Sequence, residues 1–225
     1  AVSIPKTIED LKNLIRFANE NNTSLIPRTA GTSLAGQVVG QGIVVDVSKH
    51  FNKILEVNEG EKWVRVQPGV IRDDLNMYLK PYGLYFGPET STANRAMIGG
   101  MLGNNSCGSN SIVYGSTREH VLSIRALLSD GSEVEFGGLT SEEFREKLEK
   151  SMGLEKQIYT GMHNILSDKK HQKSITSGFP KREIPRRNTG YALDLLMDCE
   201  AFTGSEKPFN FCKLLAGSEG TLALT

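Results

Sequence analysis

Three stretches of small residues have the composition of loops that hold a phosphate through backbone N–H groups. The first runs from Arg28 to Gln37 (RTAGTSLAGQ), the second combines Pro88–Ala93 with Ile98–Gly100, and the third is Gly217–Thr221. Inward-pointing N–H groups bind an anion where residues tolerate unusual backbone angles and allow close approach. The first loop taken alone is equally consistent with a plain glycine-rich surface turn. Three such loops indicate one long ligand, and a dinucleotide with a central pyrophosphate fits that requirement.

The familiar single-loop nucleotide sites are absent from the sequence. No Gly-x-x-x-x-Gly-Lys-Ser/Thr motif occurs. No Gly-x-Gly-x-x-Gly joins an expected strand to a helix with an acid about 20 residues further on. The sequence therefore favours neither a P-loop nucleotide hydrolase nor a Rossmann-type NAD enzyme.

The charge balance argues against a general attraction to polyanions. Lysines and arginines number 26, as do aspartates and glutamates, so the formal net charge is zero. No overall field draws the chain to nucleic acid or to an anionic membrane surface, and any phosphate must be held locally. The longest apolar runs, such as 42–47, are too short to cross a bilayer, and no signal-peptide pattern opens the sequence. A cytoplasmic location is the default expectation.

Metal chemistry through cysteine or histidine is not expected of this chain. The cysteines Cys107, Cys199 and Cys212 lie far apart, without a Cys-x-x-Cys pair. The histidines lack the i, i+4 spacing that places two imidazoles on one helix face. We predict no metal site within the chain, and the sequence assigns no catalytic residue.

Alternating helices and short strands must position the glycine-rich loops. Apolar spacing and capping residues predict helices at 8–18 and 71–79, from 140 onward with a capping box, and at 155–166. Strands are expected at 24–27, 43–47, 54–57, 63–67, 122–128 and 133–136, the last four as two hairpins. The irregular stretch 87–115 has the length of a functional segment, and 96–102 within it is expected to form a short buried helix.

The C-terminal third of the sequence contains two further expectations. The stretch 168–187 has seven basic residues against two acids and is interpreted as a solvated connection. The final residues, 221–225, have the pattern of a strand. A strand at the very end of a sequence predicts a piece of a longer protein.

The residues of the loops resemble, in order, the signatures of the FAD-linked oxidase family. The matching stretches are 27–36, 98–104, Gly108, Tyr114–Gly115, Asn188–Tyr191 and 217–222. This is the flavoprotein group whose fold was first described in vanillyl-alcohol oxidase and p-cresol methylhydroxylase (PCMH). Within it, the sequence is most similar to the D-lactate, glycolate and D-2-hydroxyglutarate dehydrogenases. The run Arg186–Leu193 (RRNTGYAL) is similar to long bacterial members in which a flavin module precedes iron–sulfur modules.

The resemblance implies an α+β, two-lobed PCMH-type FAD-binding domain over residues 1–225. The approximate lobes are 1–85 and 86–225, with the cofactor extended between them. A separate C-terminal substrate domain is absent from this chain. Because Thr32 occupies the position where some relatives attach the flavin through a histidine, we expect non-covalent FAD.

The resemblance also implies which residues contact FAD. The first loop wraps the pyrophosphate and 219–222 lies beside the nucleotide. The residues that line the flavin and pyrophosphate are 88–94, Gly99, Gly100 and 103–106. The expected cofactor-binding residues are Arg28, Thr29, Ala30, Gly31, Thr32, Ser33, Gly36, Pro88, Thr90, Ser91, Gly99, Gly100, Asn104, Gly108, Tyr114, Gly115, Glu219, Gly220 and Leu222.

The reaction implied is oxidation of a 2-hydroxy acid of the D-lactate, glycolate or D-2-hydroxyglutarate type to the 2-oxo acid. Hydride passes from C2 to flavin N5, and an iron–sulfur or quinone acceptor takes the electrons. The isolated chain is expected to bind FAD without turnover. Two alternatives stay open: a flavin-dependent reductase of the enolpyruvyl-sugar type with a nicotinamide donor, and a non-catalytic nucleotide-binding module.

Overall fold

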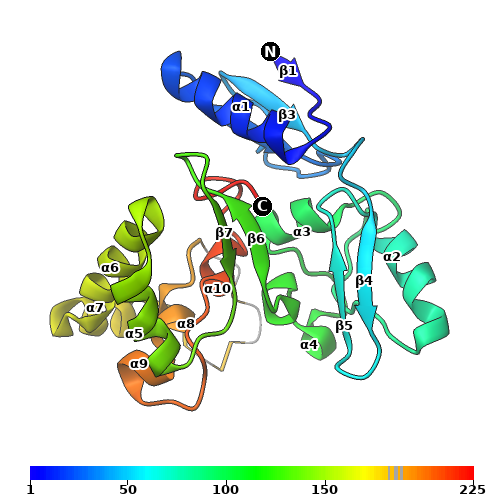
Figure 1. The fold of residues 1–225 in the computed structure, drawn as a ribbon. Coiled ribbons are helices and arrows are strands. Elements are labelled where there is room, and N and C mark those ends of the chain that lie inside the picture. Colours follow the sequence, from blue (N-terminus) through cyan, green and yellow to red (C-terminus); the bar gives the residue numbers. More distant parts are fainter. Residues whose placement is uncertain (182, 185–186, 188–189) are drawn as a thin grey trace.

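A parallel three-stranded sheet forms the N-terminal part of the fold (Figure 1). The computed structural model describes residues 1–181, 183–184, 187 and 190–225. The strands of this sheet are β1 (Val2–Ser3), β3 (Ile43–Asp46) and β2 (Leu25–Arg28), in that spatial order. The register of β2 against β3 pairs Arg28 with Asp46 at the carboxyl ends of both strands. The first glycine-rich loop therefore leaves the sheet at its carboxyl edge, where ligands of open parallel sheets bind.

Helix α1 (Ile8–Glu20) covers this sheet, and its sequence explains both its start and its orientation. Thr7 and Asp10 form a capping box, in which each side chain accepts the backbone N–H of the other residue. Leu11 and Ile15 are buried one helical turn apart and pack in one hydrophobic cluster with Val45 of β3. The helix predicted at 8–18 is confirmed.

An antiparallel hairpin and a helix follow. Strands β4 (Ile54–Asn58) and β5 (Trp63–Val66) pair as predicted, and α2 (Arg72–Leu79) leads into the 3-10 helix η1 (Lys80–Tyr82). Leu75 and Leu79 of α2 are buried in a cluster with residues of both strands. The helix predicted at 71–79 and the hairpin predicted at 54–67 are thus confirmed.

Three short helices lie within the irregular stretch 87–115 and the turn that follows it. They are α3 (Ile98–Asn104), α4 (Ser111–Tyr114) and the 3-10 helix η2 (Thr117–His120). Figure 1 shows α3 and α4 between the β4–β5 hairpin and the next hairpin of the chain. The short helix expected at 96–102 is confirmed with its start shifted to Ile98.

The largest hydrophobic cluster surrounds the second hairpin, β6 (Ile124–Leu127) with β7 (Glu133–Phe136). The helices of this part are α5 (Ser141–Lys150), α6 (Gly153–Ser167), α7 (Lys169–Gly178), α8 (Leu193–Met197), α9 (Glu200–Thr203) and α10 (Cys212–Leu215). Aromatic rings from α5, α6 and the 209–211 segment pack together here, with the Phe144 and Phe209 ring centroids 4.5 Å apart. The predicted hairpin and both predicted helices of this region are confirmed.

Two expectations for the C-terminal third are wrong. The stretch 168–187 is not a solvated connection throughout, because α7 begins at Lys169, where the Asp168 carboxylate accepts the N–H groups of Lys170 and His171. A single buried residue, Ile175, holds the helix to the core, and the high charge of the stretch obscured it. The strand expected at 221–225 is reduced to one bridge between Leu224 and Leu127, because Thr221 turns back to the carbonyl of Ser218.

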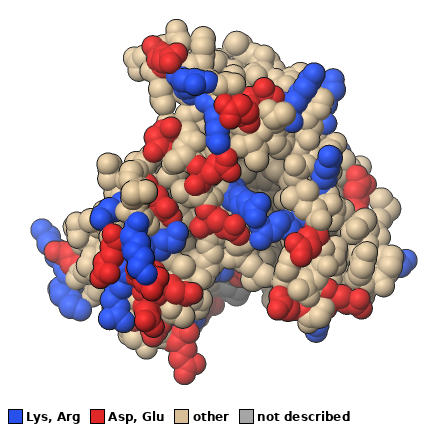
Figure 2. Space-filling view, viewed as in Figure 1, with Lys and Arg blue, Asp and Glu red and all other residues tan. Residues whose placement is uncertain are grey.

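The mixture of helices and separate small sheets confirms the α+β prediction. The lobe boundary at residue 85 stays a prediction. The cluster beneath α1 also contains Leu127, with Leu224 packed against it, and the cluster around α2 includes Ile98. Acidic and basic side chains alternate over the face drawn in Figure 2, in keeping with the zero net charge. Within the described part of the chain, none of the helices combines the length and apolar character that a bilayer span requires.

Candidate functional site

The first glycine-rich loop contacts both of the others. A Cβ atom on Gly100 would lie 2.6 Å from Thr29 Oγ1, so any side chain there would displace the Thr29 hydroxyl. A Cβ atom on Gly220 would lie 2.4 Å from Pro27 Cγ, and Gly220 has a left-handed φ of +77°. Glycine at both positions lets the loops approach closely enough to share one ligand.

The third loop is also hydrogen-bonded to the C-terminal end of α3. The N–H of Gly217 donates to the carbonyl of Leu102 at 3.0 Å, and that of Glu219 donates to the carbonyl of Gly103 at 2.9 Å. Gln37 Nε2 of the first loop donates to Glu219 Oε1 at 3.1 Å. Glu219 has a φ of +52°, a left-handed conformation that a non-glycine residue keeps only when its surroundings enforce it. The first loop, the third loop and the C-terminal end of α3 therefore meet at Glu219.

The stretch after Gly87 follows a path set by close backbone approach. A Cβ atom on Gly108 would lie 2.1 Å from the carbonyl oxygen of Glu89. Asn110 Nδ2 donates to the Glu89 carboxylate at 2.7 Å. A Cβ atom on Gly87 would lie 2.7 Å from Cγ of Tyr114. The Pro88–Thr92 segment is thereby packed against the Gly108–Tyr114 segment.

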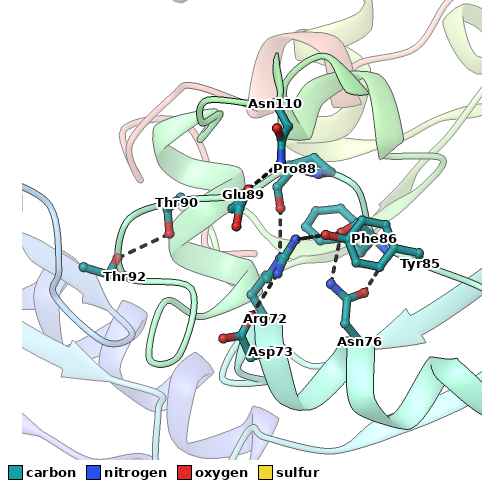
Figure 3. Close-up of polar contacts among 10 residues, drawn as sticks. All are labelled: Arg72, Asp73, Asn76, Tyr85, Phe86, Pro88, Glu89, Thr90, Thr92 and Asn110. Atoms are coloured by element: carbon teal, nitrogen blue, oxygen red, sulfur yellow. Dashed lines mark hydrogen bonds and ion pairs between the residues drawn. The ribbon is translucent and has the colours of Figure 1, made fainter. Parts of the chain in front are cut away.

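Arg72 holds the start of the Pro88–Thr92 segment, as Figure 3 shows. Its guanidinium donates to the carbonyl of Pro88 at 3.1 Å, to the hydroxyl of Tyr85 at 2.6 Å and to the carboxylate of Asp73 at 2.9 Å. Arg72 is only 5% exposed. Burial opposes its charge, but the hydrogen bonds to Asp73 and Tyr85 outweigh burial and raise its pKa. The segment that leads to the second loop is thus fixed by a buried, charged donor.

Sequence reasoning missed Arg72 and its neighbour Asn76. Asn76 exchanges two hydrogen bonds with the backbone of Phe86, of 2.8 Å and 3.2 Å (Figure 3). A signal for Arg72 exists, because it lies three and seven residues before Leu75 and Leu79 on the buried face of α2. An arginine on an apolar helix face needs buried acceptors, and this pattern is typical of a residue that holds a loop.

Arg28 does not offer a free charge to a phosphate. Its guanidinium pairs with the Asp46 carboxylate at 2.9 Å, and that carboxylate also accepts two hydrogen bonds from Ser48. A Cβ atom on Gly31 would lie 2.9 Å from Arg28 Nε, so the loop folds over the guanidinium. This arrangement agrees with a pyrophosphate held by backbone N–H groups of the loop.

The predicted site residues differ in exposure. Pro88 is buried, whereas Arg28, Thr29, Ala30, Gly31, Thr32, Ser33, Thr90, Gly99, Gly108, Gly115 and Gly220 are half-buried. Gly36, Ser91, Gly100, Asn104, Tyr114, Glu219 and Leu222 are exposed. The contacts described above bring Thr29 close to Gly100 and the first loop close to Glu219, while Gly36 has no atom within 4 Å of its Cβ position. Asn188, Thr189 and Arg186, which contributed to the family resemblance, lie outside the described residues.

The described residues contain no group of three or more His, Cys, Asp or Glu side chains placed to hold a metal ion.

Comparison with known proteins identifies the group. A family model described as an FAD binding domain matches residues 1–137, which is more than half of the chain. The chain belongs to this FAD-binding domain family. FAD is therefore the cofactor of the domain, as the sequence resemblance predicted.

Curated relatives match the FAD-binding domain over part or nearly all of its length. D-2-hydroxyglutarate dehydrogenase of Escherichia coli (strain K12) is 42% identical over 226 residues, covering 99% of this chain and 21% of that protein. The protein of the same name from Pantoea ananatis (strain AJ13355) is 39% identical, with the same coverage. Glycolate oxidase subunit GlcD of Bacillus subtilis (strain 168) is 32% identical over 139 residues, 61% of this chain and 30% of that protein. The chain thus spans only about a fifth of the length of the D-2-hydroxyglutarate dehydrogenases.

Solved structures share the fold. Alkyldihydroxyacetonephosphate synthase superposes on 60% of the FAD-binding domain and 28% of its own chain, with a TM-score of 0.52 and 25% identity. 6-Hydroxy-D-nicotine oxidase from Arthrobacter nicotinovorans gives a TM-score of 0.54 over 60% of this chain and 29% of that chain. At 20% identity this second likeness concerns the fold alone. The predicted PCMH-type fold is therefore confirmed.

Proposed function

We propose that this chain is the FAD-binding domain of an oxidoreductase that oxidises a 2-hydroxy acid to the 2-oxo acid. The observation that carries the proposal is the 42% identity to a D-2-hydroxyglutarate dehydrogenase across 99% of the chain. The substrate class is a D-2-hydroxy acid of the D-2-hydroxyglutarate, D-lactate or glycolate type. When bound, FAD supplies the hydride-accepting N5 atom of its ring.

The residues of the chain bind and orient the cofactor. Backbone N–H groups of the Arg28–Ser33 loop donate to the pyrophosphate, and the loops centred on Gly99–Gly100 and Gly220 enclose the rest of the molecule. The pairing of Arg28 with Asp46 supports an uncharged, backbone-based grip. Thr32 supplies a hydroxyl rather than an imidazole where some relatives link the flavin, which supports non-covalent binding.

The domain layout belongs to the same proposal. FAD extends between lobes of about 1–85 and 86–225, and the substrate and its catalytic base are held by a part of the protein outside this chain. The coverage of 21% of the E. coli relative supports such a further part. The proposal includes an iron–sulfur or quinone group that accepts the electrons from the flavin. It also includes a cytoplasmic location for the protein.

Cofactor binding is tested on the 225-residue chain. Titration of FAD should quench its fluorescence and raise the melting temperature of the protein, because the ligand binds only the folded state. All flavin should leave on acid denaturation, as judged by mass spectrometry of the protein. A chain that neither quenches FAD fluorescence nor gains stability from FAD would refute the proposed site.

The reaction is tested on the full-length protein that contains this chain. D-2-hydroxyglutarate, D-lactate or glycolate should bleach the flavin absorbance without oxygen, while NADPH should leave it unchanged. Bleaching by NADPH alone would instead identify a flavin-dependent reductase.

A further inference from the structure

The guanidinium of Arg118 is buried at the start of the third glycine-rich loop, close to the C-terminal end of α3. Arg118 lies in η2 and is 2% exposed. Its Nη2 and Nε atoms donate to the carbonyl of Ala216 at 2.6 Å and 3.2 Å, and Nη2 also donates to the carbonyl of Gly190 at 3.4 Å. Among the described residues, no carboxylate forms an ion pair with it. Burial lowers the pKa of this guanidinium.

Burying a charge is costly even with the Glu119 and Asp194 carboxylates nearby, so the groups that hydrogen-bond to the guanidinium are informative. Here they are main-chain carbonyls of segments that are far apart in the sequence, since Ala216 lies 98 positions after Arg118. The planar guanidinium presents several donors in fixed directions and can hold both carbonyls at once. The side chain of Arg118 therefore holds main-chain carbonyls in place and does not form a direct ion pair with a described residue.

The held carbonyl directly precedes the third loop. Gly217 follows Ala216 with a φ of +94°, and a Cβ atom there would lie 2.8 Å from Arg118 Nη2. The N–H of Gly217 in turn donates to the carbonyl of Leu102 in α3. The guanidinium thus lies against the point where the third loop turns onto the end of α3.

The backbone of Arg118 is hydrogen-bonded to the residue that ends α3. Its N–H donates to Asn105 Oδ1 at 2.9 Å, and the hydroxyl of Ser116 donates to the same oxygen at 2.9 Å. Asn105 is 1% exposed and ends α3 with a left-handed φ of 49°. One residue therefore connects the end of α3, the start of the third loop and the Gly190 segment.

We propose that Arg118 is a positioning residue for FAD. It holds the 217–220 loop and the Gly190 segment against the end of α3, so that their backbone groups face the cofactor in a fixed arrangement. This inference rests on the proposed placement of FAD in the converging loops. It assigns a role to a residue whose guanidinium is buried and donates to main-chain carbonyls.

Arg118→Met tests the role by removing the donors while keeping an apolar stem. We expect the dissociation constant for FAD, measured by fluorescence quenching on the 225-residue chain, to rise about ten-fold or more, equivalent to ~1.4 kcal/mol. Leu166→Ala is the matched control, because Leu166 is 0% exposed in α6, away from the loops. It should lower the midpoint of urea unfolding without changing FAD affinity. Unchanged affinity in Arg118→Met, or an equal loss in Leu166→Ala, would overturn the inference.

Chemical rescue separates positioning from general destabilisation. In Arg118→Ala, added methylguanidinium should restore FAD affinity and the visible circular dichroism of the bound flavin, whereas methylammonium should not. Arg118→Lys should recover only part of the affinity, because an ammonium cannot reproduce the fork that spans both carbonyls. Equal rescue by both cations, or by neither, contradicts the proposed geometry.

A second variant decides the matter if the Arg118 variants do not fold. Gly217→Ala places a methyl group against the guanidinium. Gly204→Ala is its control, because it also places alanine at a positive φ, of +69°, but with no atom within 4 Å of the new methyl group. Gly217→Ala should weaken FAD binding more than Gly204→Ala, and equal effects refute the inference. If the parent chain itself fails to bind FAD, the proposed function fails first. If the parent binds and the Gly217 and Arg118 variants bind equally well, only the inference fails.

Discussion

Gly99 and Gly161 both lie inside helices, yet a side chain would meet opposite surroundings at the two positions. A Cβ atom on Gly99 would lie 2.4 Å from Pro68 Cβ and 3.0 Å from Pro68 Cα, whereas nothing lies within 4 Å of the same position on Gly161. The N–H of Gly99 also donates to the carbonyl of Pro68 at 2.8 Å. Gly99 is therefore needed for the approach of two backbones, while Gly161 is a replaceable residue on an exposed helix face.

The two alanine variants should accordingly have opposite effects on stability. Gly161→Ala should raise the free energy of unfolding by about 0.5–1 kcal/mol, because alanine loses less backbone entropy in a helix than glycine. Gly99→Ala should lower it by about 1–3 kcal/mol through overpacking against the rigid Pro68 ring, and should also weaken FAD binding. Urea unfolding and FAD titration of both variants provide the test. A gain in stability at Gly99 with full FAD affinity would contradict the predicted site.

The buried thiol of Cys212 should make the free energy of unfolding fall as the pH becomes alkaline. It is 0% exposed, its thiol donates to the carbonyl of Phe136, and burial raises its pKa to about 12. In the unfolded chain a thiol loses its proton near pH 8.5, so between about pH 8.5 and 12 the unfolded state binds fewer protons than the folded state. The stability contributed by the neutral buried thiol is therefore present below pH 8.5 and is lost as the pH rises.

The expected loss is about 1.4 kcal/mol of unfolding free energy per pH unit for this one group. Urea unfolding at pH 8, 9 and 10 should show a steeper decline in the parent chain than in Cys212→Ala, which removes the titrating thiol. Parallel declines in the two proteins would show that Cys212 is not the group responsible.

At the scale of elements, local signals predicted most of the helices and strands. The capping boxes at Thr7 and Thr140 and the turn at Asp130–Gly131 involve residues close in sequence, so their spacing is sufficient evidence. The glycine-rich loops were recognisable for the same reason. Helix α7 was missed because one apolar residue, Ile175, is all that its sequence shows of the core.

The clamps that hold the loops were not predictable in the same way. Arg72 reaches a carbonyl 16 residues away and Arg118 one that is 98 residues away. Main-chain carbonyls are present at every position, so no spacing in the sequence identifies which of them an arginine will meet. The sequence thus predicted the loops of the site, and only the folded structure revealed the residues that fix their paths.

Arg72 connects α2 to the second loop, and Arg72→Met should loosen that connection. Losing the donors leaves the carbonyl of Pro88 unpaired, which should lower the unfolding free energy by about 1–3 kcal/mol. FAD affinity should fall because the Pro88–Thr92 segment loses its anchor. Arg125→Met is the control, since that side chain is 72% exposed and, within the described part of the chain, pairs with Glu135 at the surface. Equal stability and FAD affinity in the two variants would show that Arg72 has no anchoring role.

At the scale of the whole molecule, polar and apolar contacts both link the three sheets. Lys12 of α1 pairs with Glu133 of β7 at 2.6 Å, and Arg65 of β5 contacts Glu135 of β7 at 3.4 Å. These pairs lie at the surface, where solvent and salt weaken them. The hydrophobic cluster that contains Leu127 of β6, together with α1 and β3, is the stronger link.

That shared cluster predicts a single cooperative unfolding transition for the chain. Trp63, the one tryptophan of the sequence, reports on the β4–β5 hairpin, whereas far-ultraviolet circular dichroism reports mainly on the helices. The two signals should give the same urea midpoint, because neither end of the chain completes its core alone. Leu127 is 6% exposed, so Leu127→Ala should lower the free energy of unfolding by about 2–5 kcal/mol. Both signals should then shift together to a lower urea midpoint. Separate midpoints in the parent chain would instead mean that its parts fold independently, and FAD would then have to join two preformed units.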